Sequence, residues 1–166
     1  MVKVMFDDAS VRAAALKALV ENKIFISTVI SLCSAQALKV IVYVLYNRKK
    51  KMRELAEVLI WRTGGMPSSH AAVVSSLVTS VAFAEGISSN LFIFSFWFAL
   101  VVLRDAMGVR RSAGLMAKAL NDLGKQASEK TGLDFRLVKE IQGHTPLEVV
   151  VGCLLGVSIA VGLSLL

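Results

Sequence analysis

The sequence is short of charged residues, histidine, proline and cysteine, and these shortages narrow the class of protein. Charged residues make up only 19% of the chain and hydrophobic residues 55%, a balance that argues against an ordinary water-soluble domain. The two cysteines, Cys33 and Cys153, lie far apart in apolar stretches with no CxxC or Cys/His cluster around them. Neither a disulfide framework nor a zinc site is therefore indicated, and we interpret both residues as small buried hydrophobic side chains.

The charges that are present favour anionic partners. Lys plus Arg number 19 and Asp plus Glu number 12, which gives a net charge of +7. Such a surplus is typical of proteins that bind nucleic acid, an anionic membrane face or a phosphorylated substrate. The hydrophobicity of the chain argues against nucleic acid, so membrane lipids and phosphorylated molecules are the expected partners.

Four long apolar stretches predict an all-α integral membrane helical bundle that forms one domain over residues 1–166. A helix of about 20 residues crosses a hydrocarbon core of about 30 Å. The predicted transmembrane spans are 24–46, 67–85, 91–109 and 145–166. The third is strongly apolar only as far as Leu103, so we extend it through Arg104 and Asp105 to reach this length. A short helix is expected before the first span, at 10–22.

Two basic loops orient the predicted bundle. Residues 47–66 hold six bases against two acids, and residues 110–143 hold seven against four. The positive-inside rule places both loops in the cytoplasm and both termini on the opposite side of the membrane. We expect this membrane to be the cytoplasmic membrane. Within the second loop, apolar residues at helical spacing predict an amphipathic interfacial helix that lies on the membrane surface or caps the bundle. These residues are Ala113, Met116, Leu120 and Leu123.

Polar residues gather at the predicted cytoplasmic ends of the spans, where such costly side chains mark functional sites. They are Lys39 on the first span, His70 on the second, Asp105, Arg110 and Arg111 at the third, and His144 and Glu148 at the fourth. Each histidine lies within three residues of a proline, and proline favours the first turn of a helix. With Gly64, Gly65 and Gly143 leaving backbone amides uncrowded, we expect two helix N-termini to face one anion.

Each of these features also has a purely structural interpretation. Thr145 and Glu148 form a capping box, in which the carboxylate only satisfies backbone amides. Arg110 and Arg111 are also typical of a span anchored at lipid headgroups. A functional site is favoured because the structural interpretations must hold independently at every position.

Three motifs carry a resemblance to a known family. They are Gly64-Gly65-Met66-Pro67-Ser68-Ser69-His70, Asp105-Ala106-Met107-Gly108-Val109-Arg110-Arg111 and Gly143-His144-Thr145-Pro146-Leu147-Glu148. In this order they resemble the divergent branch of the type-2 phosphatidic acid phosphatase superfamily, the acid phosphatase/vanadium-dependent haloperoxidase-related membrane proteins. The resemblance runs from about Gln36 to the C-terminus. It implies that His144 is the nucleophile, Glu148 the carboxylate that orients it, and His70 the general acid.

The sequence departs from the wider superfamily in four places. Ser69 stands where glycine is usual, and Glu148 stands where aspartate is usual. The arginine expected six residues before the nucleophile is Val138, and the Lys-x6-Arg-Pro motif fails because Tyr46 lies seven residues after Lys39. Asp105 has no clear counterpart in the superfamily, and we expect it either to hold Arg110 or Arg111 in place or to have no role there, with Arg104 paired to another group. The groups left to bind phosphate are Lys39, Arg110, Arg111, Gly65, Ser68 and Ser69.

The resemblance implies a lipid phosphatase that works through a phosphohistidine, with neither a metal nor a cofactor. Its substrate would be phosphatidic acid, phosphatidylglycerol phosphate or a polyprenyl phosphate, drawn to a cytoplasmic site by the basic loops. Two alternatives stay open. One is a non-hydrolytic binder or transporter of anionic lipids. The other is a structural protein that forms a homo-oligomer or larger complex through the face carrying Gly152 and Gly156, because GxxxG is typical of helix packing or dimerisation.

Overall fold

The computed structural model describes residues 9–46, 65–140 and 143–166, and its elements there are all helices. They are α2 (Ala9–Glu21), α3 (Lys23–Tyr46), α5 (Ser69–Glu85), α6 (Asn90–Arg104), the π-helical turn η1 (Asp105–Val109), α7 (Arg110–Thr131) and α8 (Pro146–Leu165). The first predicted basic loop lies outside the described residues, apart from its last two positions.

The helices confirm an all-α membrane protein, with three helices long and apolar enough to cross a bilayer among the described residues. These are Lys23–Leu45, Asn90–Thr131, which joins α6, η1 and α7, and Pro146–Leu165. The remaining expected span corresponds to α5, whose 17 residues extend about 26 Å. Because a hydrocarbon core is about 30 Å thick, the count of four spans stays a prediction.

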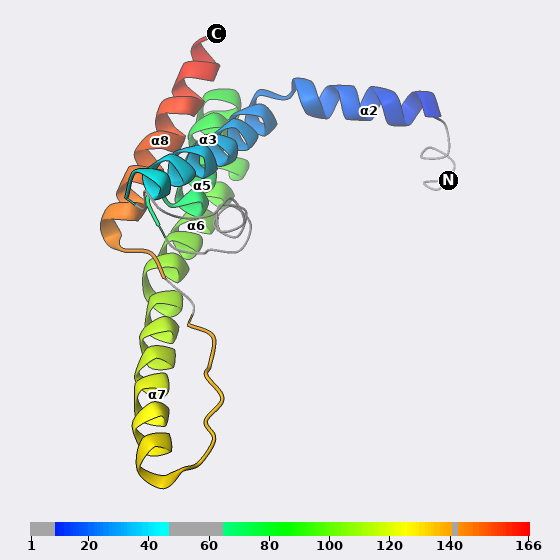
Figure 1. Cartoon of the computed structure of the whole chain (residues 1–166). Helices are drawn as coiled ribbons and strands as arrows, with labels where there is room; N and C mark the ends of the chain where they lie inside the picture. Colours follow the sequence, from blue (N-terminus) through cyan, green and yellow to red (C-terminus); the bar gives the residue numbers. More distant parts are fainter. Residues whose placement is uncertain (1–8, 47–64, 141–142) are drawn as a thin grey trace.

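Helix α5 lies at the centre of the bundle and packs against α3, α6 and α8 (Figure 1). Its buried residues are small or β-branched, among them Ala71, Ala72 and Val74. Small side chains let helix backbones approach closely, which is how helices associate when lipid removes the hydrophobic driving force.

Gly152 and Gly156 make the closest of these approaches. A Cβ on Gly152 would meet the carbonyl oxygen of Ser68, and one on Gly156 would meet that of Ala72. The GxxxG pattern therefore packs α8 against α5 within the chain. The face that we expected for a homo-oligomer packs on α5 in this structure, and the oligomeric state stays a prediction.

Helix α7 does not cap the bundle. It follows α6 through η1 without a break and extends away from the other helices (Figure 1). The expectation that this helix caps the bundle is therefore wrong, because α7 continues the direction of α6, and its position at the membrane surface stays a prediction. Residues 132–140 return along its side as an extended segment (Figure 1).

The short N-terminal helix is confirmed as α2, which has no buried residue and extends away from the bundle (Figure 1). The expectation of two buried cysteines is wrong, because Cys33 is exposed and Cys153 is only half-buried. The apolar surroundings of Cys33 in sequence reflect a lipid-facing helix surface and not a protein core.

The contact between α5 and α8 predicts that Gly156→Ala lowers the stability of the bundle by about 1–3 kcal/mol, because its methyl group would overlap the Ala72 carbonyl. Gly162→Ala on the same helix is the matched control, since its Cβ would meet nothing within 4 Å. Thermal unfolding in detergent micelles measures both variants. Equal melting temperatures for the two would contradict this packing.

Candidate active site

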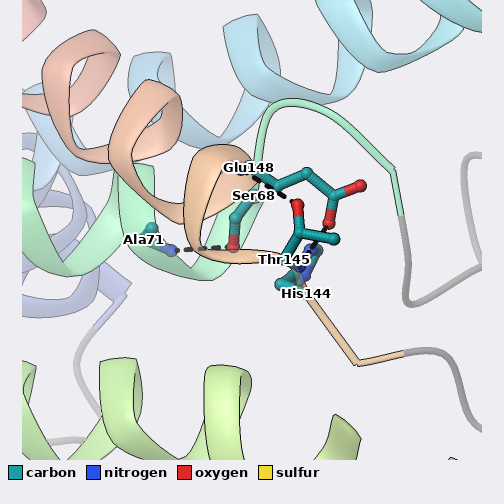
Figure 2. A network of polar contacts seen from close by, with 5 residues as sticks. All are labelled: Ser68, Ala71, His144, Thr145 and Glu148. Carbon is teal, nitrogen blue, oxygen red and sulfur yellow. Dashed lines mark hydrogen bonds and ion pairs between the residues drawn. The ribbon is translucent and has the colours of Figure 1, made fainter.

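The carboxylate of Glu148 joins the start of α8 to His144. Thr145 is the N-cap residue, and its hydroxyl accepts a hydrogen bond from the Glu148 N–H at 3.4 Å. Oε2 of Glu148 accepts from the Thr145 N–H at 3.0 Å and lies 3.2 Å from Nδ1 of His144 (Figure 2). Glu148 therefore closes a capping box and contacts the imidazole at the same time, and its functional role stays a prediction.

This contact sets the tautomer of His144. An ionised carboxylate can only accept hydrogen bonds, so Nδ1 carries the proton and Nε2 keeps its lone pair. The backbone of His144 is fixed as well, because its N–H donates to the carbonyl oxygen of Ala106 at 3.1 Å. Gly143 packs against the backbone of Arg111, where any Cβ would clash. His144 is thus held through its backbone and through Nδ1, and the residue is only 2% exposed.

The π-helical turn η1 places Arg110. Its N–H donates to the carbonyl of Asp105, five residues earlier, and its Nε lies 2.6 Å from Oδ2 of the same residue. Residues five apart on an α-helix point about 140° apart, whereas the wider π turn brings them to neighbouring directions. The expectation that Asp105 holds an arginine is confirmed for Arg110. The pair is about 40% exposed, so it orients the guanidinium more than it stabilises the fold.

Helix α5 brings the second histidine to the same place. Ser68 caps α5 by accepting from the Ala71 N–H, and its own N–H donates to the Glu148 carbonyl at 3.0 Å (Figure 2). His70 lies in the first turn of α5, and its ring centre is 6.3 Å from that of His144. The sequence-based pairing of the two histidines therefore has a structural counterpart.

The backbone amides are less free than expected. Those of Ser68, Ala71, His144, Thr145 and Glu148 all donate hydrogen bonds within the chain. The expected anion site between two helix N-termini is corrected to this extent, because capping uses the amides that an anion would need. Ser68 is fully buried as a cap, and Ser69 is also buried.

The three expected cations differ in how they meet the histidines: Lys39 and Arg110 act through their charges, and Arg111 does not. Lys39 is buried, and its Cγ lies 3.7 Å from where a Cβ on Gly65 would be. The charges of Lys39 and Arg110 act on both imidazoles, whereas that of Arg111 is not among those acting on either. Arg111 is exposed and meets the site through its backbone at Gly143.

Burial lowers the pKa of the His144 imidazole below its ordinary value, and this effect outweighs the opposing hydrogen bond and charge of Glu148. The positive charges of Lys39 and Arg110 lower the pKa further. His144 is therefore neutral at physiological pH, as a nitrogen nucleophile must be. Among the described residues, no three His, Cys, Asp or Glu side chains group as a metal site would require.

One residue that the sequence analysis missed ties the segment before His144 to α7. Asn121 donates through Nδ2 to the Val138 carbonyl and to Oε1 of Glu140, both at 2.9 Å, and accepts from the Val138 N–H at 2.8 Å. Its neighbour on the helix, Gly124, contacts the ring of Phe135. No motif marks Asn121, although a buried asparagine within a helix requires partners for its amide.

A polar cluster of two histidines and a carboxylate, in which only His144 is buried, lies at one end of an apolar helical bundle and defines a membrane protein with a candidate catalytic site. The chain belongs to the Divergent PAP2 family, whose model matches residues 20–159. It is 36% identical over 159 residues to the "Uncharacterized membrane protein YuiD" of Bacillus subtilis (strain 168), which covers 88% of this chain and 96% of the relative. No solved structure matches the chain.

The environment of His144 predicts that its imidazole titrates below the ordinary histidine pKa. Glu148→Gln is expected to lower this pKa further, because the carboxylate that favours the protonated ring is lost. NMR titration of histidine-labelled protein in micelles measures both values. A pKa at or above the ordinary one in the wild type, or a rise in Glu148→Gln, would contradict the geometry.

The Asn121 contacts predict that Asn121→Ala frees the extended segment from α7. Proteolytic cleavage within 132–140 should become faster, because three hydrogen bonds to this segment are lost. Asp122→Ala, at the next and exposed position, serves as the control and should leave the cleavage rate unchanged. Equal rates in the two variants would show that Asn121 does not hold the segment.

Proposed function

We propose that this protein is a membrane phosphatase that hydrolyses a lipid phosphomonoester or diphosphate through a phosphohistidine. One observation carries the proposal: two imidazoles face each other across 6.3 Å, and one is bound through Nδ1 by a carboxylate. Membership of the Divergent PAP2 family supports a relationship to phosphatases. The reaction and the roles of the residues are our inference.

The resemblance to the superfamily supplies the two roles, and the step balances when His144 begins neutral and His70 begins protonated. Nε2 of His144 attacks phosphorus, and the bond between phosphorus and the lipid oxygen breaks as His70 gives that oxygen a proton. Water then attacks the phosphohistidine, His70 takes up the proton of the water, and phosphate leaves as Nε2 is released. A nucleophile about 3 Å from phosphorus, the P–O bond that breaks and an acid about 3 Å from the leaving oxygen together require more than about 6 Å between the two ring nitrogens. The ring centres lie 6.3 Å apart, so the imidazoles would have to separate as the phosphate enters.

The charge that develops on the phosphoryl oxygens would be met by Lys39 and Arg110. Phosphoryl transfer depends on electrostatic stabilisation more than on covalent chemistry, and buried cations are the most effective. The fixed position of Arg110 beside Asp105 avoids reorganisation during the reaction. Gly65 and Ser69 remain candidates for phosphate contact, and exposed Arg111 suits the approach of a headgroup.

The substrate would be an anionic lipid such as phosphatidic acid, phosphatidylglycerol phosphate or a polyprenyl phosphate. His70 is exposed while His144 is 2% exposed, so the phosphate would enter from the side of His70. The basic residues of 110–143 favour a site on the cytoplasmic face of the cytoplasmic membrane, where they would attract anionic headgroups.

A second candidate is a non-hydrolytic binder or transporter of anionic lipids. The burial of His144 favours this candidate, because an imidazole that phosphate cannot reach forms no phosphohistidine. This candidate would keep Lys39, Arg110 and His70 as the anion site. Lipid transfer between liposomes without phosphate release would distinguish it from the phosphatase.

The decisive test is phosphate release by the purified protein from a panel of these lipids in mixed micelles. His144→Ala is expected to abolish release, and His70→Ala to lower kcat by about 10²–10⁴-fold, because each removes one step of the transfer. Vanadate, which adopts the geometry of the transition state, should inhibit the wild type.

Ser158→Ala, an exposed position on α8, is the matched control and should retain full activity. Acid-labile phosphate bound to the wild type but not to His144→Ala after rapid quenching would identify the phosphohistidine. Undiminished release by His144→Ala would refute the assigned nucleophile.

A further inference from the structure

A continuous apolar stripe runs from the last residue of η1 along α7, and the described residues leave it exposed. Its members are spaced by four, three, four, three and four residues, which is the heptad spacing of a coiled-coil seam. They are Val109, Ala113, Met116, Leu120, Leu123 and Ala127. All six are exposed, and the four larger ones are between 49% and 70% exposed. The returning segment packs on the neighbouring face, through Asn121 and Gly124, and leaves the stripe open.

Most charges of α7 lie away from this stripe, although Lys130 stands at its next heptad position. At 100° per residue, every charged residue from 111 to 129 lies on the opposite side of the helix. These residues are Arg111, Lys118, Asp122, Lys125 and Glu129. A helix that lies on an anionic bilayer needs cations beside its apolar face. Between residues 111 and 129, no cation stands next to the stripe. The flanking positions are Ser112, Ala117, Ala119, Gly124 and Gln126, so two copies of the stripe would meet without repulsion.

The connection to α6 settles how two copies could meet. Because α6, η1 and α7 form one continuous run, α7 projects from the membrane along the direction of a spanning helix (Figure 1). Two copies in one membrane share their orientation, so their α7 helices would be parallel about a twofold axis along the membrane normal. The stripe covers about 27 Å, which is short for an isolated coiled coil, but anchoring in one membrane raises the effective concentration of the partner helix.

We propose that α7 is a self-association helix, and that two copies of this protein pair through the stripe as a parallel two-stranded coiled coil outside the membrane. The proposal rests on the spacing, the exposure and the placement of charge on α7. It is independent of whether the site hydrolyses a lipid phosphate. The Gly152 and Gly156 face takes no part, because α5 covers it.

Cysteine cross-linking of the full chain in lipid nanodiscs tests the pairing. In a parallel pair about a twofold axis, each seam residue meets its own copy, so Leu120→Cys should form a disulfide-linked dimer on mild oxidation. Leu115→Cys is the matched control, since Leu115 is a leucine of α7 that lies off the stripe and is 61% exposed, against 49% for Leu120. Both are made in a Cys33→Ala/Cys153→Ala background whose helix content is checked by circular dichroism.

A second measurement needs no cysteine. Leu120→Gln/Leu123→Gln should weaken self-association at least about tenfold in sedimentation equilibrium in detergent, whereas Leu115→Gln should not change it. Cross-linking that is equal at positions 115 and 120, or absent from both, would overturn the proposal. So would a dimer that the double variant leaves unchanged, or a label at Leu120 that lipid-bound quenchers reach in a monomeric protein.

Discussion

The close approach of α8 to α5 is the constraint on which the candidate site depends. Gly152 and Gly156 let the two backbones come within contact of each other, and the Ser68 N–H then reaches the Glu148 carbonyl. This single bond ties the starts of both helices together. His70 lies two residues after one end of it, and His144 lies four residues before the other. Side chains at Gly152 and Gly156 would push α8 away from α5. The imidazoles of His70 and His144 would then separate, although the added side chains touch neither ring.

Much of this arrangement could be predicted from local sequence. Four apolar runs, a capping box at Thr145 and a proline before each helix place two histidines at helix starts, and the structure contains both. The direction of α7, the engaged amides and the π turn could not be predicted in this way. Each depends on a contact between distant residues, such as the bond from the His144 N–H to the Ala106 carbonyl, for which no local pattern exists. The five-residue interval between Asp105 and Arg110 is the one trace of η1 that a sequence carries.

The geometry also gives a reason for a departure from the wider superfamily. Position 138, where an arginine is usual, is bound to Asn121. Asn121 lies ten residues along α7 from Arg111, about 15 Å from the start of that helix. A side chain at position 138 is therefore too far along α7 to reach the two histidines. The cations that act on the imidazoles come instead from α3 and from the start of α7, namely Lys39 and Arg110.

The π turn adds one residue to the path between α6 and α7. Relative to an uninterrupted α-helix, it rotates everything that follows by about 100°. Deleting one residue from η1 would hardly change the composition or the apolar length of this helix. It would, however, change the rotation of α7 about the helix axis relative to α6. The guanidinium of Arg110 and the apolar stripe of α7 would turn together, away from the Ala106 carbonyl that holds His144. Helical phase, and not the presence of particular side chains alone, thus links the interior of the bundle to the outer surface of α7.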